Sequence, residues 1–427
     1  MKDVVAELRW RGLLHQTTDD ENLAAWLLEK PRTVYAGFDP TADSLHVGHL
    51  VALTILRRFQ QAGHRPIALV GGATGMIGDP SGRSDERNLL TEETIQSNID
   101  SIEPQMRRFL DFNESNDNGA LLVNNYDWMK KFGYLEFLRD IGKMFPVNVM
   151  LAKDSVKSRL DSESGISYTE FSYMLLQAYD FVQLFDQHGC ELQVGGSDQW
   201  GNITAGVDLG RRMRSAQLQG ATCPLLLNSE GQKMGKTAKG ALWLSPDKTS
   251  PYQFYQYWIN VADADVGRCI KFFSDMEQAE CETLLKMHEE APQKRAAQRL
   301  LAEELTRQVH GDDGLVAAER ATAIFFGAEI SEVSDAQLGS IFADVSSKEL
   351  SRSVLNEGLL LIDAFVESGL AKSKGEARRT IQQGGAYVNN RRLQDLEIQL
   401  TTDDLASETM MVLRSGKKRY AVLRFVD

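Results

Sequence analysis

The chain has 427 residues, of which 42% are hydrophobic and 25% are charged. This composition is typical of a soluble globular protein, and the length favours two to four domains. No apolar run approaches the roughly 18 residues that a membrane-spanning helix needs, so we expect no membrane partner. The charged N-terminus predicts no signal peptide. Four widely spaced cysteines without a C-x-x-C pair predict a reduced, cytoplasmic chain that has no structural metal.

The net charge of −13 is unevenly distributed along the chain. Residues 371–427 contain 11 Lys and Arg against 7 Asp and Glu, a net charge of +4, so the remaining residues carry −17. An acidic protein as a whole is a poor partner for nucleic acid. A basic module at one end can nevertheless bind RNA locally.

Strands and helices alternate in the first half of the chain. The patterns predict a strand over 32–38, a helix over 46–61 and an almost wholly apolar strand over 66–71. Apolar strands of this kind suit a parallel sheet that is covered on both faces. We therefore predict an α/β fold, a Rossmann-like doubly wound parallel sheet, in residues 1–225, with a more helical insertion over 91–190.

The remaining chain divides into three predicted parts. An all-helical pattern predicts an α-helical domain over 226–327. Residues 328–352 are acidic, rich in serine and weakly periodic, which predicts a linker. Two short helices followed by strands at 386–388 and 410–424 predict a small α+β domain over 353–427.

The first chemical motif, His46-Val47-Gly48-His49, lies where the first strand gives way to a helix. A helix N-terminus has free N–H groups and partial positive charge, so phosphate binds there favourably. Imidazoles at i and i+3 share a face and can donate hydrogen bonds to phosphate or ribose oxygens. A two-histidine metal site and an exposed helix face are the alternatives, although no third ligand at an obvious spacing supports a metal.

A second motif, Lys233-Met234-Gly235-Lys236-Thr237, follows a glycine-containing turn. Two ammonium groups on a mobile loop can reach oxyanions as point charges. Alone, such a loop is usually a solvated turn. Following the histidine motif in this order, it predicts a site that holds the triphosphate of ATP.

Two further groups of polar residues follow in the predicted sheet domain. Tyr173, Gln177 and Asp180 are spaced i, i+4 and i+7 and therefore share one face of a predicted helix. An ordinary amphipathic helix is the alternative explanation of this spacing. Small residues after the strand at 192–194 allow a nucleotide to approach the backbone, and Asp198 can accept hydrogen bonds from ribose hydroxyls.

The two motifs together resemble those of class I aminoacyl-tRNA synthetases, with Gly235 where the general KMSKS-type pattern has serine. Three longer segments resemble bacterial-type tyrosyl-tRNA synthetases, and the likeness covers essentially the whole chain. These segments are Phe38–His46, Gly71–Pro80 and Gly195–Asn202. The resemblance implies a catalytic first domain, an anticodon-side helical domain and an RNA-binding last domain.

The resemblance also implies substrates and a reaction. The substrates would be ATP with Mg²⁺, L-tyrosine and tRNA(Tyr), and no structural metal is expected. The tyrosine carboxylate would attack the α-phosphate of ATP, giving tyrosyl-adenylate and pyrophosphate. The tyrosyl group would then pass to the 3′-terminal adenosine of the tRNA. A symmetric homodimer is expected, with residues 137–148 in its interface.

The resemblance assigns roles to individual residues. The expected catalytic residues are Thr41, His46, His49, Lys233, Lys236 and Thr237. The expected tyrosine site comprises Asp79, Tyr173, Gln177 and Gln199, with Tyr35 and Asp180 at the phenolic hydroxyl. The expected contacts of ATP are Gly37, Asp39, Gly48, Gly196, Asp198 and Lys236. The departing pyrophosphate is expected to meet Arg83 and Arg87.

The basic residues of the last domain resemble those of a small RNA-binding fold named after a ribosomal small-subunit protein. Contacts with tRNA are expected mainly through phosphate and shape. The residues expected to make them are Lys374, Arg378, Arg379, Arg391, Arg392, Arg414, Lys417, Lys418 and Arg419. Solvated surface charge is the alternative for any such run.

Three other functions stay open at this point. Other nucleotidylyltransferases carry His-x-Gly-His but do not need a basic C-terminal domain. A tryptophanyl-tRNA synthetase would bind an indole, which has no phenolic hydroxyl. A non-enzymatic RNA-binding protein would not need the histidine and lysine motifs that this chain retains.

Overall fold

The computed structural model describes residues 1–81, 89–161, 165–237, 240–331, 333–343 and 345–426, without the side chain of Thr237. Within these residues the chain forms two compact units. The N-terminal unit comprises residues 1–249 and 257–309, and the C-terminal unit comprises residues 250–256 and 310–427.

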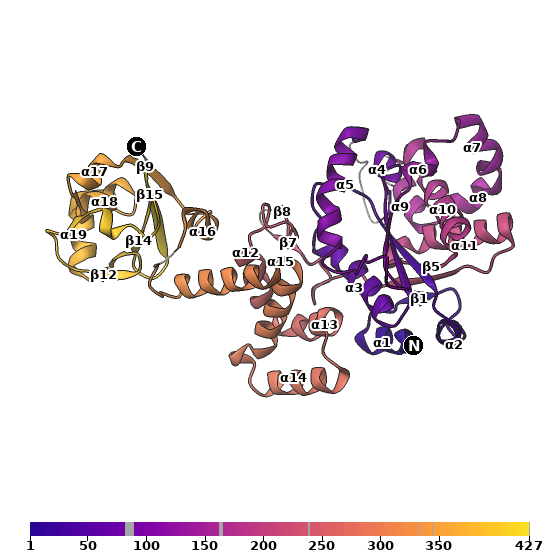
Figure 1. Cartoon of the computed structure of the whole chain (residues 1–427), viewed down its shortest axis with the longest axis horizontal. Coiled ribbons are helices and arrows are strands. Elements are labelled where there is room, and N and C mark those ends of the chain that lie inside the picture. The colour runs from indigo at the N-terminus through magenta and orange to yellow at the C-terminus, as the bar shows by residue number, and fades with distance from the viewer. Residues whose placement is uncertain (82–88, 162–164, 238–239, 332, 344, 427) are drawn as a thin grey trace. The chain divides into compact units, whose positions relative to one another are not determined.

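The N-terminal unit contains a sheet of six strands among the described residues, with helices on both of its faces (Figure 1). The strands are β1 (Gln16–Thr17), β2 (Thr33–Phe38), β3 (Arg65–Val70), β4 (Leu121–Asn124), β5 (Cys190–Gly196) and β6 (Gln219–Cys223). Their order is β1-β6-β5-β2-β3-β4, and only β1 runs antiparallel to its neighbour in this described sheet. The predicted doubly wound parallel sheet is thus confirmed.

The helices of the sheet region follow the strands closely. They are α1 (Val4–Arg11), α2 (Leu23–Glu29), α3 (Val47–Gln61), α4 (Thr74–Ile77), α5 (Glu92–Met106), α6 (Tyr126–Met129), α7 (Tyr134–Asp140), α8 (Val147–Leu151), α9 (Asp154–Leu160), α10 (Tyr168–His188) and α11 (Trp200–Arg214). The helical insertion predicted over 91–190 also contributes β4, which extends the sheet beside β3.

The central strands are apolar because both faces of the sheet are covered. Five of the six residues of β3 are buried, the exception being Arg65. Val34, Tyr35 and Ala36 of β2 are buried as well. Helix α10 packs its buried face, including Phe181 and Leu184, into the same core as Tyr35. Consecutive parallel strands end at one edge of such a sheet, and a ligand crevice is expected there.

Beyond the sheet the chain continues through a small hairpin and a helical region. The elements are β7 (Lys236–Thr237), β8 (Gly240–Ala241), α12 (Pro251–Ile259), α13 (Asp263–Phe273), α14 (Gln278–Glu290) and α15 (Ala296–Phe325). Helix α15 contains one non-helical residue, Gly311, at φ 75° and ψ −179°, a conformation that glycine alone adopts readily. Gly311 lies two residues beyond the end of the N-terminal unit at Val309.

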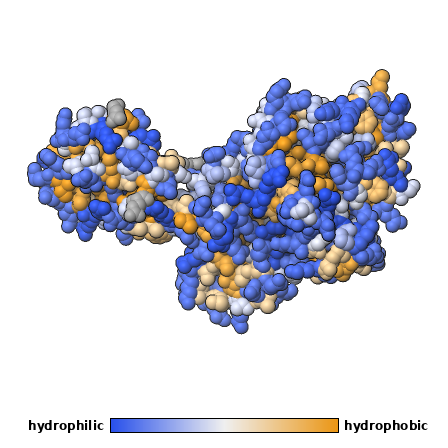
Figure 2. All heavy atoms as spheres, in the orientation of Figure 1, coloured by the Kyte–Doolittle hydropathy of each residue, from blue (hydrophilic) through white to orange (hydrophobic). Residues whose placement is uncertain are grey.

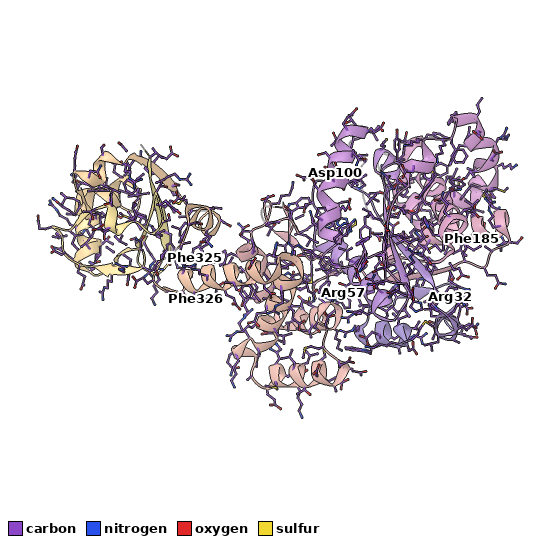
Figure 3. All side chains as sticks on the ribbon, in the orientation of Figure 1. Arg32, Arg57, Asp100, Phe185, Phe325 and Phe326 are labelled. Atoms are coloured by element: carbon purple, nitrogen blue, oxygen red, sulfur yellow. The ribbon has the colours of Figure 1, made fainter. Side chains whose placement is uncertain are left out.

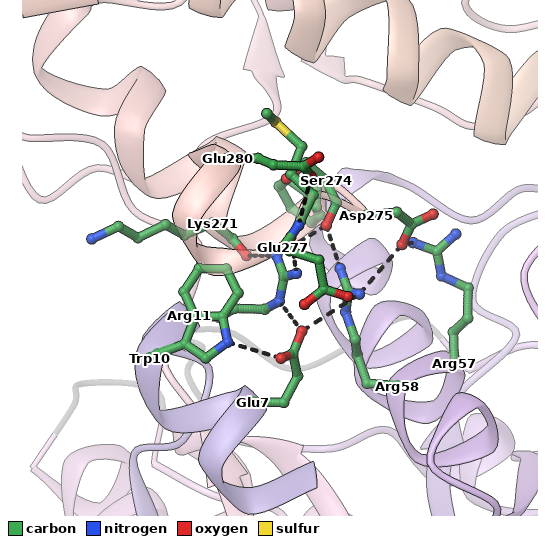
Figure 4. Close-up of polar contacts among 12 residues, drawn as sticks. Glu7, Trp10, Arg11, Arg57, Arg58, Lys271, Ser274, Asp275, Glu277 and Glu280 are labelled. Atoms are coloured by element: carbon green, nitrogen blue, oxygen red, sulfur yellow. Dashed lines mark hydrogen bonds and ion pairs between the residues drawn. The ribbon is translucent and has the colours of Figure 1, made fainter. Parts of the chain in front are cut away.

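A buried arginine cluster joins α1 and α3 to the C-terminal end of α13 (Figure 4). The Arg11 guanidinium donates to the carbonyl oxygens of Lys271 at 2.8 Å and Ser274 at 2.9 Å. Arg58 donates to the same Ser274 carbonyl, and Arg57 forms an ion pair with Asp275 at 2.8 Å. The last carbonyls of a helix lack intrahelical partners and carry partial negative charge, so guanidinium groups stabilise them.

The C-terminal unit has a five-stranded sheet with the order β12-β11-β14-β15-β9 among the described residues. Its elements are α16 (Asp335–Ile341), β9 (Ser347–Ser351), α17 (Ser353–Asn356), β10 (Leu359–Leu360), α18 (Leu361–Glu367), α19 (Lys374–Gln382), β11 (Ala386–Val388), β12 (Arg391–Leu393), β13 (Gln399–Leu400), β14 (Met410–Ser415) and β15 (Arg419–Val426). The pairings in the five-stranded sheet are antiparallel except for β15 with β9.

The prediction of a linker over 328–352 is wrong for the described part of that segment. Helix α16 and strand β9 lie within it, and β9 pairs with β15 along its whole length. Leu338 and Phe342 are buried in a hydrophobic cluster with residues of β14 and β15. The few apolar residues of this acidic segment are therefore the ones that attach it to the sheet.

The end of α15 belongs to the C-terminal unit. Phe325 stacks on Tyr252, with ring centroids 4.9 Å apart, and meets Phe342 and Tyr420 edge-on or tilted. The neighbouring Phe326 is 87% exposed (Figure 3). The helical domain predicted over 226–327 thus has its last residues inside the C-terminal unit.

Candidate nucleotide and amino-acid site

A cavity of about 730 Å³ opens at the carboxyl ends of β2 and β5 in the N-terminal unit. These two strands are neighbours at the middle of the sheet. The cavity brings together most of the residues predicted from the sequence. Those that line it are Tyr35, Gly37, Asp39, Thr41, His46, Gly48, His49, Asp79, Tyr173, Gln177, Asp180, Gly196, Asp198, Gln199, Lys233 and Lys236.

Three predicted residues are not placed by the structure. Arg83 and Arg87 lie outside the described residues, and so does the side chain of Thr237. The backbone of Thr237 pairs with Gly240 in the β7–β8 hairpin. Their predicted contacts with pyrophosphate and the triphosphate stay predictions.

The two histidines are fixed by the start of α3. His46 is the residue before the helix, and its Nδ1 accepts the backbone N–H of Gly48 at 3.0 Å. The Nδ1 of His49 accepts the backbone N–H of His46 at 3.2 Å, and the two rings stack with centroids 3.9 Å apart. An accepting nitrogen carries no proton, so each neutral ring has its proton on Nε2. In this tautomer, Nε2 is the nitrogen of each ring that can donate a hydrogen bond.

Gly48 has a steric role that the sequence did not reveal. A Cβ at this position would lie 2.7 Å from Cε1 and 2.9 Å from Nδ1 of His46. Any side chain here would push the imidazole out of its capping position. The glycine therefore places His46, in addition to leaving the helix start open to a ligand.

The lysine loop is attached to the same helix start through main-chain hydrogen bonds. Leu242 donates to the carbonyl of Gly235 at 2.7 Å, and its own carbonyl accepts the N–H of Val47 at 3.0 Å. Lys233 and Lys236 are exposed and lie on either side of Gly235, whose φ is 79°. A residue with a side chain is strained at this φ, and its Cβ would also lie 3.0 Å from Val47. Both observations account for glycine at this position.

Asp39 and Asp79 accept hydrogen bonds from other pocket residues. The Tyr173 hydroxyl donates to Asp39 Oδ2 at 2.9 Å, and Thr74 donates to Asp39 Oδ1 at 2.7 Å. Asp79 Oδ2 accepts the Gln199 amide at 2.6 Å. Because the Tyr173 hydroxyl donates its proton to the hydrogen bond with Asp39, the lone pairs of the Tyr173 oxygen can accept a hydrogen bond from a cationic group.

Asp180 lies fully buried on α10 and is held by two donors. Its Oδ1 accepts the indole N–H of Trp128 at 2.8 Å, and its Oδ2 accepts the side-chain amide of Asn125 at 3.0 Å. Burial nevertheless raises the pKa of Asp180 from 3.8 to about 8, because the two hydrogen bonds offset only part of the desolvation. The Tyr35 hydroxyl is buried and has no hydrogen-bond partner among the described residues.

Asn125 and Trp128 were not selected from the sequence. Both follow β4, which lies beside β3, and they reach Asp180 from more than fifty positions away along the chain. Asn125 also accepts the N–H of Ala73 at 2.7 Å and donates to Thr74 at 3.0 Å. The adjacent polar residues Asn124 and Asn125, after the apolar residues 121–123, were the available signal for Asn125.

The turn after β5 forms another part of the pocket wall. A Cβ on Gly196 would lie 2.7 Å from Asp198 Oδ1, so the turn needs glycine to accommodate this carboxylate. Burial raises the pKa of Asp198, and the nearby Asp79 raises it further. Among the described residues, no group of three or more His, Cys, Asp or Glu side chains could hold a metal ion.

The basic residues predicted to bind tRNA all lie in the C-terminal unit, but their environments differ. Arg414 is buried, with its guanidinium 3.7 Å from the centroid of the Tyr387 ring. Lys374 forms an ion pair with Asp363 at 2.6 Å, and Arg391 forms one with Glu329. The exposed members of the set are Lys374, Arg378, Arg379, Arg391, Arg392, Lys417, Lys418 and Arg419.

Comparison with known proteins identifies the class to which this fold and site belong. Residues 28–327 match the family described as tRNA synthetases class I (W and Y). Residues 337–423 match the tyrosine–tRNA ligase SYY-like C-terminal domain. The fold and the site therefore define a class I aminoacyl-tRNA synthetase.

Full-length relatives narrow the class to one family. The chain is 57% identical to the tyrosine–tRNA ligase of Rhodopirellula baltica over 99% of this chain and 97% of the relative. It is 50% identical to that of Geobacillus stearothermophilus over 99% and 100% of the two chains. A truncated mitochondrial tyrosyl-tRNA synthetase from Aspergillus nidulans superposes with a TM-score of 0.67 and 32% identity, covering 76% of this chain and 95% of that one. The chain belongs to the tyrosine–tRNA ligase family.

Proposed function

We propose that the pocket at the ends of β2 and β5 carries out the reaction of this family, the ATP-dependent attachment of tyrosine to tRNA. The observation that carries the proposal is the convergence of His46, His49, Lys233, Lys236 and the buried Asp180 on one cavity. Tyrosine would lie at the Asp180 end and ATP at the histidine end. The tRNA would be the second substrate, and Mg²⁺ would enter with ATP.

The tyrosine end discriminates by hydrogen bonding. The Tyr35 hydroxyl and the Asp180 carboxyl group are the proposed partners of the phenolic hydroxyl, and a phenylalanine there would leave the Tyr35 hydroxyl unpaired. Asp79, the Tyr173 oxygen and Gln177 are the proposed partners of the substrate ammonium. Gln199, which donates to Asp79, would fix that carboxylate beside the substrate.

At the ATP end, the reaction forms a bond between a tyrosine carboxylate oxygen and the α-phosphorus. The bond from that phosphorus to the bridging oxygen breaks, and negative charge develops on the leaving pyrophosphate. The proposed donors to that charge are His46 Nε2, Lys233, Lys236, Thr41, Thr237, Arg83 and Arg87. His49 Nε2, Gly196 and Asp198 would contact the ribose, and Gly37, Asp39 and Gly48 the remaining ATP atoms. No protein nucleophile is required, so catalysis rests on positioning and charge.

Substitution of one histidine and one lysine tests these roles. His46→Ala and Lys236→Ala should each lower the rate constant of adenylate formation about 100-fold, with a smaller change in ATP affinity, because the lost contact forms mainly in the transition state. Lys286→Ala, which removes an exposed lysine of α14, is the matched control. Unchanged adenylate formation in both variants would contradict the assignment.

The exposed basic residues of the C-terminal unit are the proposed tRNA contacts, and a homodimer is the proposed assembly. Tyr134 and Leu135 of α7, Val147 of α8 and Tyr168 of α10 are large apolar side chains that are exposed in the single chain. Figure 2 shows hydrophobic side chains gathered over α7. Exposed apolar patches of this kind mark protein interfaces.

Sedimentation measures the proposed assembly directly. Leu135→Asp should convert the dimer to monomers, because the charge would be buried in the interface. A parent chain that sediments as a monomer would contradict the proposal.

Among the described residues no helix is long and apolar enough to cross a membrane. A cytoplasmic location, where translation uses charged tRNA, is part of the proposal.

A further inference from the structure

The lysine loop is held by side chains from α12 and α13 as well as by α3. The Tyr257 hydroxyl, on α12, accepts the backbone N–H of Gly235 at 2.8 Å. On α13, Arg268 donates to the carbonyl of Leu227, and Asp265 accepts the Ser229 hydroxyl at 3.4 Å. These contacts hold the loop before and inside the Lys233–Lys236 motif, within the N-terminal unit.

The contact with Tyr257 falls on Gly235, one of the two residues between the lysines. The N–H of Gly235 is bound by Tyr257, and its carbonyl is bound by the N–H of Leu242. Leu242 in turn accepts the first N–H of α3, from Val47, next to His46. A continuous series of hydrogen bonds therefore runs from Tyr257 through the loop to the helix that presents the histidines.

Helix α13, which carries Arg268 and Asp265, is anchored to other helices of the N-terminal unit. At its C-terminal end, helix α13 is joined to α1 by the guanidinium group of Arg11 and to α3 by those of Arg57 and Arg58 (Figure 4). Tyr257 itself packs its ring edge-on against Trp258, with centroids 5.1 Å apart. Trp258 is fully buried. The Tyr257 hydroxyl is thus held by packing that does not depend on the loop.

We infer that Tyr257 is a positioning residue that latches the Lys233–Lys236 loop against the pocket. The inference rests on the proposed roles of the two lysines in ATP activation. A loop that is already in place loses less conformational freedom when its ammonium groups meet the developing charge. Tyr257 does not line the cavity, so it acts through Gly235 and does not contact the substrate.

Tyr257→Phe is a sharp test because it keeps the ring and removes only the hydroxyl. Tyr252→Phe is the matched control, since Tyr252 lies on the same helix and its ring stacks on Phe325. The full-length variants are compared by trypsin cleavage after Lys233 and Lys236 in the free protein. Single-turnover formation of tyrosyl-adenylate at saturating ATP is the second measurement, and thermal unfolding checks that the fold is retained.

The latch predicts faster cleavage at both lysines in Tyr257→Phe, by about threefold to tenfold, the range that corresponds to one neutral hydrogen bond. The rate constant of adenylate formation should fall by a similar factor, with little change in the KM for ATP. The control should match the parent chain in both measurements. Cleavage at the parent rate in Tyr257→Phe would overturn the latch. Faster cleavage with an unchanged adenylate rate would support the latch and contradict the proposed roles of the lysines.

Discussion

Replacement of Gly48 by alanine separates the stability of α3 from the function of its first histidine. The new Cβ would lie 2.7 Å from the His46 ring, closer than nonbonded carbon atoms approach. The imidazole is the movable partner, so the cheapest relief is rotation of the ring. That rotation breaks the 3.0 Å hydrogen bond that caps the helix and the stacking on His49.

The Gly48→Ala change has two effects on the free energy of unfolding that oppose each other, whereas its effect on activity is not offset. Loss of the cap costs about 1 kcal/mol. Alanine in place of glycine in a helix returns up to about 1 kcal/mol, so the free energy of unfolding should change little. Removal of one preorganised donor from the developing charge costs about 100-fold in rate. Gly48→Ala should therefore unfold like the parent chain yet form adenylate about 100-fold more slowly.

The assay pairs pyrophosphate exchange with thermal unfolding. Gly201→Ala is the control, because Gly201 is likewise the second residue of its helix and its Cβ would meet only Lys153 Cδ at 3.6 Å, an ordinary contact. The control should keep the parent activity. Full activity in Gly48→Ala would refute the link between this glycine and the placement of His46.

Four further substitutions test three separate parts of the account. Tyr35→Phe removes a buried hydroxyl that has no hydrogen-bond partner among the described residues. The variant should therefore be more stable by about 1 kcal/mol in denaturant titrations of the free protein, and its KM for tyrosine should rise about tenfold. A destabilised variant would contradict this prediction. The pKa of Asp180 is raised from 3.8 to about 8, so the native state holds this proton more tightly than the unfolded chain, and the resulting stability is lost as the pH rises through that range. Asp180→Asn cannot ionise and should gain stability relative to the parent between about pH 5 and about pH 8; a difference that does not vary with pH would refute the raised pKa. Lys418→Ala should weaken tRNA binding and reduce its salt dependence by about one counterion, without changing the stability of the protein. Arg414→Ala removes a buried guanidinium from the Tyr387 ring and should instead destabilise the C-terminal unit. The opposite pattern in filter-binding and unfolding experiments would contradict these two roles.

The sequence was sufficient for the sheet and for the local geometry of the histidine motif. A strand, a short turn and a helix start are encoded within residues 33–61, so the position of His46 and His49 follows from local rules. The spacing of Tyr173, Gln177 and Asp180 likewise placed these three residues on one face of α10, and all three line the cavity.

Contacts between distant elements could not be predicted in the same way. Trp128 reaches Asp180 only because β4 pairs beside β3, a register that no local pattern specifies. The acidic segment with α16 and β9 reads as a linker because its few apolar residues, such as Leu338, are buried by strands far along the chain. The sequence likewise does not indicate that, among the basic residues predicted to bind tRNA, Arg414 is the buried one.

Amino-acid-dependent exchange of pyrophosphate into ATP, measured for each standard amino acid without tRNA, tests the central claim most directly. The geometry of Asp180 and Tyr35 beside the histidine and lysine motifs predicts exchange with tyrosine alone. Exchange with tryptophan or another amino acid in place of tyrosine, or no exchange with any of them, would contradict the account.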